Sequence, residues 1–170
     1  MKKHVVKDYF TGARFALLKK KSFHSITVSD LVKKSGASRA SFYRNYESKE
    51  QIVDEFCRQV FGDVFEEHPI NVDNIRDQVR RIFTRIHDHY EELLLLNQAG
   101  LLNYIDRYVF DGTMAQINDN QVLNNKYQPF FFAGAASAMI KAWIEFGFQE
   151  SPEEITEYFF RSLKGYMDYE

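Results

Sequence analysis

Apolar residues recur at spacings of three and four along most of the chain, which is the period of a helix with one buried face. The stretches with this period are residues 5–20, 72–96, 99–117, 126–147 and the segment that follows Ser151. We expect a bend near His89, within the second stretch. Only three prolines interrupt the 170 residues. The pattern therefore predicts an all-α protein.

Capping signals divide the chain into short helices after the first of these stretches. Thr27 and Asp30 form a Thr-x-x-Asp box that can open a helix, and Gly36 can take the left-handed conformation that ends it. Ser38 can cap a second short helix that runs to about Asn45. Two short helices joined by a glycine-containing turn form a helix-turn-helix, whose second helix enters the major groove of DNA.

Two more capping signals set the layout of the remaining chain. Ser48 and Gln51 predict the start of a fourth helix, and Ser151 and Glu154 predict the start of the last one. Pro69 breaks the chain between them. We therefore expect a helix-turn-helix head at residues 1–48, a connecting helix at 48–67, and a helical body at 68–170.

Charge is distributed unevenly between these parts. Residues 1–50 carry 12 Lys/Arg and 4 Asp/Glu, a net charge of +8, whereas residues 51–170 carry a net charge of −10. A basic head on an acidic body favours a head that meets a polyanion. An uneven but merely solvated surface is the alternative.

The helix after Ser38 separates into an inner and an outer face. At about 100° per residue, Phe42 and Tyr46 point the same way, toward the core. Arg44 can donate to guanine or to a phosphate, and Tyr43 can donate to a phosphate. The outer side carries Ala40, Ser41, Tyr43 and Arg44, with Arg39 at the helix start. Solvated polar residues without a partner are the alternative interpretation.

Residues 26–56 resemble the DNA-binding head of the tetracycline-repressor (TetR) family of bacterial regulators. The matching features are Phe23, the Thr27 cap, the Gly36-x-Ser38 turn, Phe42-Tyr43-x-x-Tyr46 and Ser48-Lys49-Glu50. The body matches in its helical layout and in the "ESPEE" that precedes its last helix. The resemblance implies a three-helix DNA-binding head and a C-terminal body for ligand binding and dimerisation.

The resemblance also implies a function. The protein would be a transcriptional regulator, a ligand-responsive repressor, that binds a near-palindromic operator in double-stranded DNA as a homodimer. The candidate DNA-binding residues are Thr27, Ser29, Ser38, Arg39, Ala40, Ser41, Tyr43, Arg44, Asn45 and Lys49. One position departs from the family, because Asn45 stands where His or Tyr is frequent and reaches less far. Lys49 opposes the dipole of the next helix, and a phosphate would explain its presence.

The resemblance implies a dimer that forms through the two C-terminal helices of each subunit. The residue types in one of these helices suit such an interface. Residues 130–147 contain small residues that allow two helices to approach closely, namely Ala133, Gly134, Ala135, Ala136 and Ala138. An ordinary buried helix inside one subunit is the alternative. The resemblance also implies a small-molecule effector pocket in this body, whose occupancy changes the spacing of the two heads.

Aromatic residues with a few polar tips suit such a pocket. The candidate ligand-binding residues are Phe83, His87, Tyr90, Tyr104, Tyr108, Phe132 and Trp143. Aromatic residues at helical spacing also build cores, so pocket and core are not separated by this pattern. Without a cluster of cations among them, we expect a small apolar or aromatic effector.

Other classes of function are disfavoured. His87 and His89 lie two residues apart and point about 200° from each other on a helix, so they cannot share one metal ion. No glycine-rich phosphate loop and no nucleophile elbow occurs. We expect no enzyme activity, no cofactor and no metal. An activator or co-regulator whose body docks a partner protein is the alternative function.

The sequence also bears on location. Cys57 is the single cysteine, which fits a reducing compartment. The longest stretch without charge, residues 127–140, is shorter than the ~20 residues that a membrane helix needs. We expect a cytoplasmic protein without a membrane span.

Overall fold

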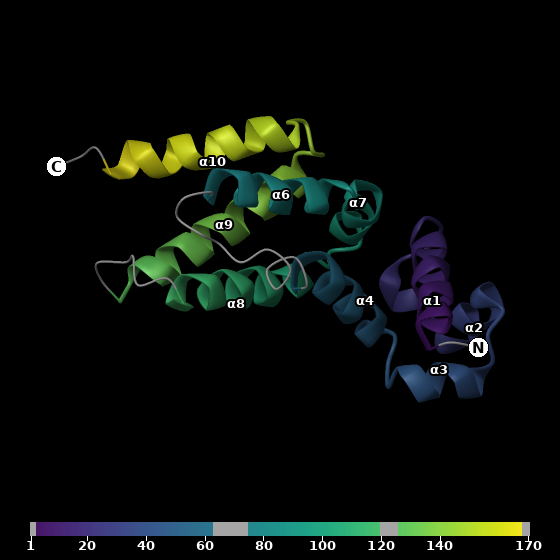
Figure 1. Ribbon diagram of the computed structural model, residues 1–170. Coiled ribbons are helices and arrows are strands. Elements are labelled where there is room, and N and C mark those ends of the chain that lie inside the picture. The colour runs from purple at the N-terminus through teal and green to yellow at the C-terminus, as the bar shows by residue number, and fades with distance from the viewer. Residues whose placement is uncertain (1–2, 63–74, 120–125, 168–170) are drawn as a thin grey trace.

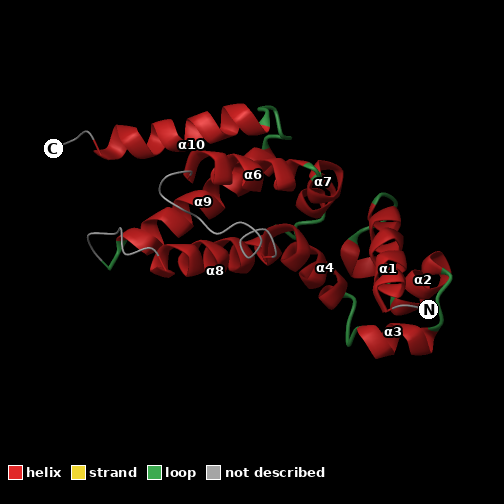
Figure 2. Cartoon of the chain, in the orientation of Figure 1, coloured by secondary structure: helices red, strands yellow, loops and turns green. Residues whose placement is uncertain are grey.

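The computed structural model describes residues 3–62, 75–119 and 126–167, and every regular element in these ranges is helical (Figures 1 and 2). The elements of the first range are α1 (Lys3–Leu18), a 3-10 turn (Phe23–Ser25), α2 (Val28–Ser35), α3 (Arg39–Asn45), α4 (Glu50–Cys57) and a π-helical turn (Arg58–Gly62). The later elements are α6 (Ile75–His87), α7 (Tyr90–Gln98), α8 (Asn103–Asp119), α9 (Gln128–Glu145) and α10 (Pro152–Met167). The all-α prediction is confirmed.

The head is built around a small apolar core of its own. Its buried members are Val6, Phe10, Ile26, Leu31, Phe42, Tyr46 and Ile52. The ring of Phe10 on α1 meets Phe42 edge-on at 5.3 Å and Tyr46 at 6.0 Å. Phe42 is fully buried and Tyr46 is 3% exposed, so the predicted inward direction of both side chains is confirmed.

The capping signals around the helix-turn-helix work as predicted. The Thr27 hydroxyl accepts from the Asp30 N–H, while the Asp30 carboxylate accepts from the Thr27 N–H at 2.8 Å. Gly36 ends α2 in the left-handed conformation with φ of 70°. The Ser38 hydroxyl accepts from the Ser41 N–H at 3.0 Å and caps α3. These local bonds fix the turn between the two helices.

The predicted capping box between Ser48 and Gln51 does not form, so this prediction is wrong. Helix α4 starts after Lys49, and no side chain caps its first turn. The Gln51 side chain instead accepts from the N–H of Glu47 at 2.7 Å. This amide lies in the turn before the helix, so Gln51 stabilises the connection from α3 rather than the N-terminus of α4.

Head and body share a second, larger core. Phe15 on α1 and Phe56 on α4 pack edge-on at 4.9 Å, and Phe56 meets His89, just before α7, at 5.7 Å. Lys19, just after α1, forms an ion pair with Glu91 of α7 at 3.9 Å. Helix α4 thus contributes to both cores. The predicted boundary at Pro69 lies outside the described residues.

The body packs α8 along α9, while α10 lies beside α6 and also contacts α9 (Figure 1). The predicted bend near His89 is the break between α6 and α7. The Ser151 hydroxyl accepts from the Glu154 N–H at 3.2 Å, so the box that opens α10 is confirmed. Arg80 and Glu153 form an ion pair at 3.3 Å between α6 and α10.

One predicted segment is only partly described, and another ends later than predicted. The connecting helix is seen to Gly62, with a π-helical last turn, and residues 63–67 are outside the described ranges. Helix α8 continues to Asp119, two residues beyond its predicted end. Among the described helices, none is both long and apolar enough to cross a membrane.

Candidate nucleic-acid interface

The outer side of α3 presents a row of exposed side chains. Arg39, Tyr43 and Arg44 are exposed, as are Ser38 and Ala40. Tyr43 is 53% exposed although its ring leans edge-on against the buried ring of Phe42 at 5.3 Å. The Arg39 guanidinium lies 5.9 Å from the centre of the Tyr43 ring. This face offers guanidinium and hydroxyl donors on a small, rigid helix.

Two residues expected on this face lie elsewhere. Ser41 is buried, with 8% of its surface exposed, and Asn45 is half-buried. The Asn45 amide donates to the Ser41 carbonyl at 2.7 Å, one turn earlier on α3. The prediction that Ser41 lies on the outer side of the helix is wrong, because the buried stripe of Phe42 and Tyr46 is wide enough to include it.

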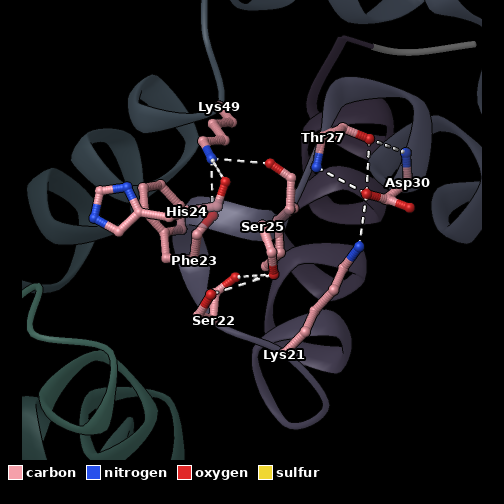
Figure 3. A network of polar contacts seen from close by, with 9 residues as sticks. Lys21, Ser22, Phe23, His24, Ser25, Thr27, Asp30 and Lys49 are labelled. Atoms are coloured by element: carbon pink, nitrogen blue, oxygen red, sulfur yellow. Dashed lines mark hydrogen bonds and ion pairs between the residues drawn. The ribbon is translucent and has the colours of Figure 1, made fainter.

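The start of α2 adds a second exposed group. Thr27 and Ser29 are exposed at the first turn of this helix, where free N–H groups and the helix dipole favour an anion. Asp30 also accepts from the Lys21 ammonium at 2.7 Å (Figure 3). The hydrogen bond from Lys21, followed by those from Thr27, lowers the pKa of the Asp30 carboxyl. The Asp30 carboxylate of the capping box therefore stays ionised to lower pH than an ordinary aspartate.

Lys49 points away from the row on α3 and toward the backbone before α2. Its ammonium donates to the carbonyls of Phe23 at 2.8 Å, His24 at 3.2 Å and Ile26 at 2.9 Å (Figure 3). It also lies 4.6 Å from the centre of the Phe23 ring. Sequence patterns could not indicate these partners, because they are 23 to 26 residues away along the chain.

Four of the seven candidate ligand residues contact one another. Phe83 and Trp143 are buried and meet edge-on at 5.6 Å. His87 stacks on Trp143 at 5.8 Å and on the exposed Tyr90 at 5.6 Å. These four residues form one aromatic cluster on α6, α7 and α9. Phe148, which sequence reasoning missed, completes it at 4.7 Å from Trp143.

The remaining three candidates lie on α8 and α9. Tyr104 and Tyr108 are half-buried on α8, and a Cβ atom added to Gly62, at the end of the π-helical turn, would lie 3.4 Å from the Tyr108 ring. The Tyr108 hydroxyl accepts from Arg107 at 2.6 Å. Phe132 is half-buried on α9, with the exposed ring of Phe131 beside it at 5.7 Å.

An open groove of about 450 Å³ lies between α8 and α9, and none of the seven candidates lines it. Asp106 at its centre accepts from Ser137 at 2.9 Å and pairs with Lys141 at 3.0 Å. Arg107 at its edge pairs with Asp54 of α4 at 3.1 Å. The sequence could not indicate this groove, because its charged partners come from helices 30 or more residues apart.

Arg14 is an ionisable residue that the sequence patterns did not single out. It is 1% exposed, and its three guanidinium nitrogens have no hydrogen-bond partner among the described residues. The guanidinium lies against the rings of Phe15 at 3.9 Å and Phe56 at 5.2 Å, in the core that head and body share. Burial lowers the pKa of Arg14 to about 10, so the group is still charged at neutral pH.

His87 and His89 face different neighbours. His87 belongs to the aromatic cluster with Trp143, whereas His89 packs against Phe56. Burial, followed by the charge of Arg85, lowers the pKa of His89. No group of three or more metal-ligating side chains comes together in the part of the chain that the structure describes.

This arrangement defines a protein with a helix-turn-helix head joined to a helical body. The family described as "Bacterial regulatory proteins, tetR family" matches residues 13–56, and "Transcriptional regulator C-terminal region" matches residues 73–165. The chain belongs to the tetR family of bacterial transcriptional regulators. Members of this family are regulators and not enzymes.

Individual relatives agree with this assignment. An uncharacterized HTH-type transcriptional regulator, YvaF, from Bacillus subtilis is 33% identical over 104 residues, which are 57% of this chain and 50% of the relative. The chain thus matches about half the length of that protein. A TetR transcriptional regulator from Streptococcus agalactiae shares the fold with a TM-score of 0.63 and 18% identity over 92% of both chains. Lin0861 from Listeria innocua has a TM-score of 0.70 and 15% identity over 95% of this chain and 90% of its own.

Proposed function

We propose that the protein binds an operator in double-stranded DNA through α2 and α3 and represses transcription as a homodimer. The observation that carries this proposal is the exposed row of Arg39, Tyr43 and Arg44 on a helix anchored by the buried Phe42. The head that presents the row has a net charge of +8 over residues 1–50. A protein of this kind acts in the cytoplasm, where bacterial DNA is found.

Within this proposal, α3 enters the major groove and α2 lies across the phosphate backbone. Arg39 and Arg44 are exposed and long enough to reach base edges, and Ala40 between them lets the helix backbone approach closely. Ser38 and Tyr43 on α3, with Thr27 and Ser29 at the start of α2, offer hydroxyls to phosphates. Ser41 exposes only 8% of its surface and Asn45 is half-buried, so these two candidates are less accessible to DNA than Arg39, Tyr43 and Arg44.

Substitutions at Arg44 and Tyr43 are expected to separate base contacts from phosphate contacts. Arg44→Ala should weaken operator binding by about 1–3 kcal/mol and lower the preference for operator over scrambled DNA. Tyr43→Phe removes one hydroxyl and should weaken binding to both DNAs equally. Fluorescence anisotropy with both duplexes measures each effect. Equal losses on both DNAs in Arg44→Ala would show that this residue holds a phosphate instead.

We propose that the two subunits meet through α9 and α10. Helix α9 exposes Phe130, Phe131 and Phe146 by 55, 54 and 68% of their surfaces, with Gly134 and Ala138 exposed between them. Large exposed apolar patches mark interaction sites. Small residues between the phenylalanines allow a second helix to approach closely. A self-complementary face of this kind suits a twofold dimer, which also matches the near-palindromic operator proposed here.

Phe131→Glu is expected to break this dimer. A buried aromatic anchor at an interface commonly contributes 2 kcal/mol or more, so we expect the dimer Kd to rise by about 30-fold or more. Sedimentation equilibrium measures that constant. Tyr9→Glu is the matched control, because Tyr9 is exposed to a similar degree on α1 of the head, outside the proposed interface. A dimer unchanged in Phe131→Glu would place the interface elsewhere.

We also propose that a small apolar or aromatic effector binds the body and shifts the spacing of the two heads. What supports this proposal is the aromatic cluster around Trp143, in which His87 is half-buried and Tyr90 is exposed, so that an aromatic compound can stack there. A screen for compounds that release labelled operator tests this proposal. If the body instead docks a partner protein, no small compound releases the operator, and the protein acts as an activator or co-regulator.

A further inference from the structure

We infer that Lys49 is a positioning residue, which holds the start of α2 in place for its DNA contacts and does not bind a phosphate itself. This inference rests on the proposed function, since it concerns how the head is aligned on DNA. It differs from what the sequence implies, which is a direct contact. The side-chain geometry around the ammonium carries the argument.

The ammonium of Lys49 has three hydrogens, and three carbonyls accept them. The acceptors are Phe23, His24 and Ile26, at 2.8, 3.2 and 2.9 Å from Nζ (Figure 3). A compact ammonium can serve converging acceptors in this way, whereas a planar guanidinium cannot. A phosphate could bind Nζ only by displacing one of these backbone oxygens.

The three carbonyls belong to the segment that leads into α2. Ile26 directly precedes Thr27, the N-cap of this helix, and the 3-10 turn at Phe23–Ser25 precedes Ile26. From the other side, Asp30 accepts from the Thr27 N–H and from Lys21 (Figure 3). The segment is therefore held at both ends, by Lys49 from the start of α4 and by Asp30 from within α2.

This clamp links the two DNA-facing helices. Lys49 is the N-cap of α4 and follows α3 by four residues, so its bonds join the end of α3 to the beginning of α2. Thr27 and Ser29, the exposed residues proposed to meet phosphates, lie directly after the clamped carbonyls. The clamp also explains a lysine at a helix N-terminus, where its charge opposes the dipole.

Two substitutions at Lys49 distinguish a clamp from a phosphate contact. Lys49→Met keeps the aliphatic stem and removes the charge, whereas Lys49→Arg keeps the charge and replaces the ammonium by a planar group. Lys33→Met, at an exposed position on α2, is the control for loss of one charge. Operator affinity is measured by anisotropy over a salt series, at a temperature well below the melting point of every variant.

A clamp predicts that both Lys49 variants lose affinity about tenfold, the effect of losing charge-assisted hydrogen bonds, with a salt slope equal to that of the natural protein. A phosphate contact predicts that Lys49→Arg binds normally and that Lys49→Met has a salt slope shallower by about 0.9. That second result overturns the inference. Unchanged affinity in both variants overturns it as well, because Lys49 would then serve stability alone.

Amide hydrogen exchange on the free protein separates this inference from the proposed function. The Leu31 N–H donates to Thr27 in the first turn of α2, and its exchange is expected to become faster in both Lys49 variants than in Lys33→Met. If the natural protein binds no operator, the proposed function fails, and this exchange still reports on the clamp. Unchanged exchange at Leu31 in both variants contradicts the clamp.

Discussion

Phe42→Ala is expected to lower the free energy of unfolding by about 3–5 kcal/mol, as large-to-small changes of a buried phenylalanine do. Phe42 is fully buried, and its ring meets Phe10 at 5.3 Å and Tyr46 at 5.8 Å. The small core of the head cannot fill the resulting cavity, so α3 loses its anchor. We therefore expect operator binding to disappear together with the head's stability.

Tyr43→Ala is the matched control for this result. Tyr43 is the next residue on α3, but it is 53% exposed, so its loss should change stability by no more than about 0.5 kcal/mol. Thermal unfolding by circular dichroism compares the two variants. A melting temperature that falls equally in both would show that the inner and outer sides of α3 have been assigned wrongly.

Arg14→Met is expected to stabilise the protein. The Arg14 guanidinium is buried in the core that head and body share, and the described residues offer it ring faces but no hydrogen-bond acceptor. Replacing buried charged groups by apolar residues of similar volume can raise stability by about 1–4 kcal/mol. We expect the melting temperature to rise by several degrees.

Lys20→Met removes the same charge at an exposed position near the end of α1 and is the control. Its melting temperature should stay close to that of the natural protein, since an isolated exposed charge contributes little. A lower melting temperature in Arg14→Met would contradict the account. It would mean that the contacts of Arg14 with Phe15 and Phe56 outweigh the cost of burying its charge.

The parts of the head that sequence reasoning predicted correctly depend on short-range chemistry. The Thr27 and Asp30 box, the left-handed Gly36 and the Ser38 cap each involve residues at most four positions apart. The inward direction of Phe42 followed from the helical period alone. The bonding partners of such signals lie within a few residues of each other, so tertiary packing does not change which bonds form.

The features that sequence reasoning did not predict depend on contacts between distant segments. Ser41 is buried because α3 packs more of its surface than the period of Phe42 and Tyr46 indicated. The partners of Lys49 come from a turn more than 20 residues earlier, and the burial of Arg14 requires α1 and α4 together. In the body, the spacing of aromatic residues could not predict which candidates contact Trp143 and which, such as Tyr104, lie on α8.

Binding to DNA by the head is the central claim, and selection from a pool of randomised duplexes tests it most directly. The enriched sequence and a scrambled control are then compared by fluorescence anisotropy over a salt series. We predict enrichment of a near-palindromic sequence, tight binding to it over the control, and a slope of about −0.9 for each phosphate contact. Failure to enrich any sequence, with weak and equal binding to both duplexes, would contradict the account.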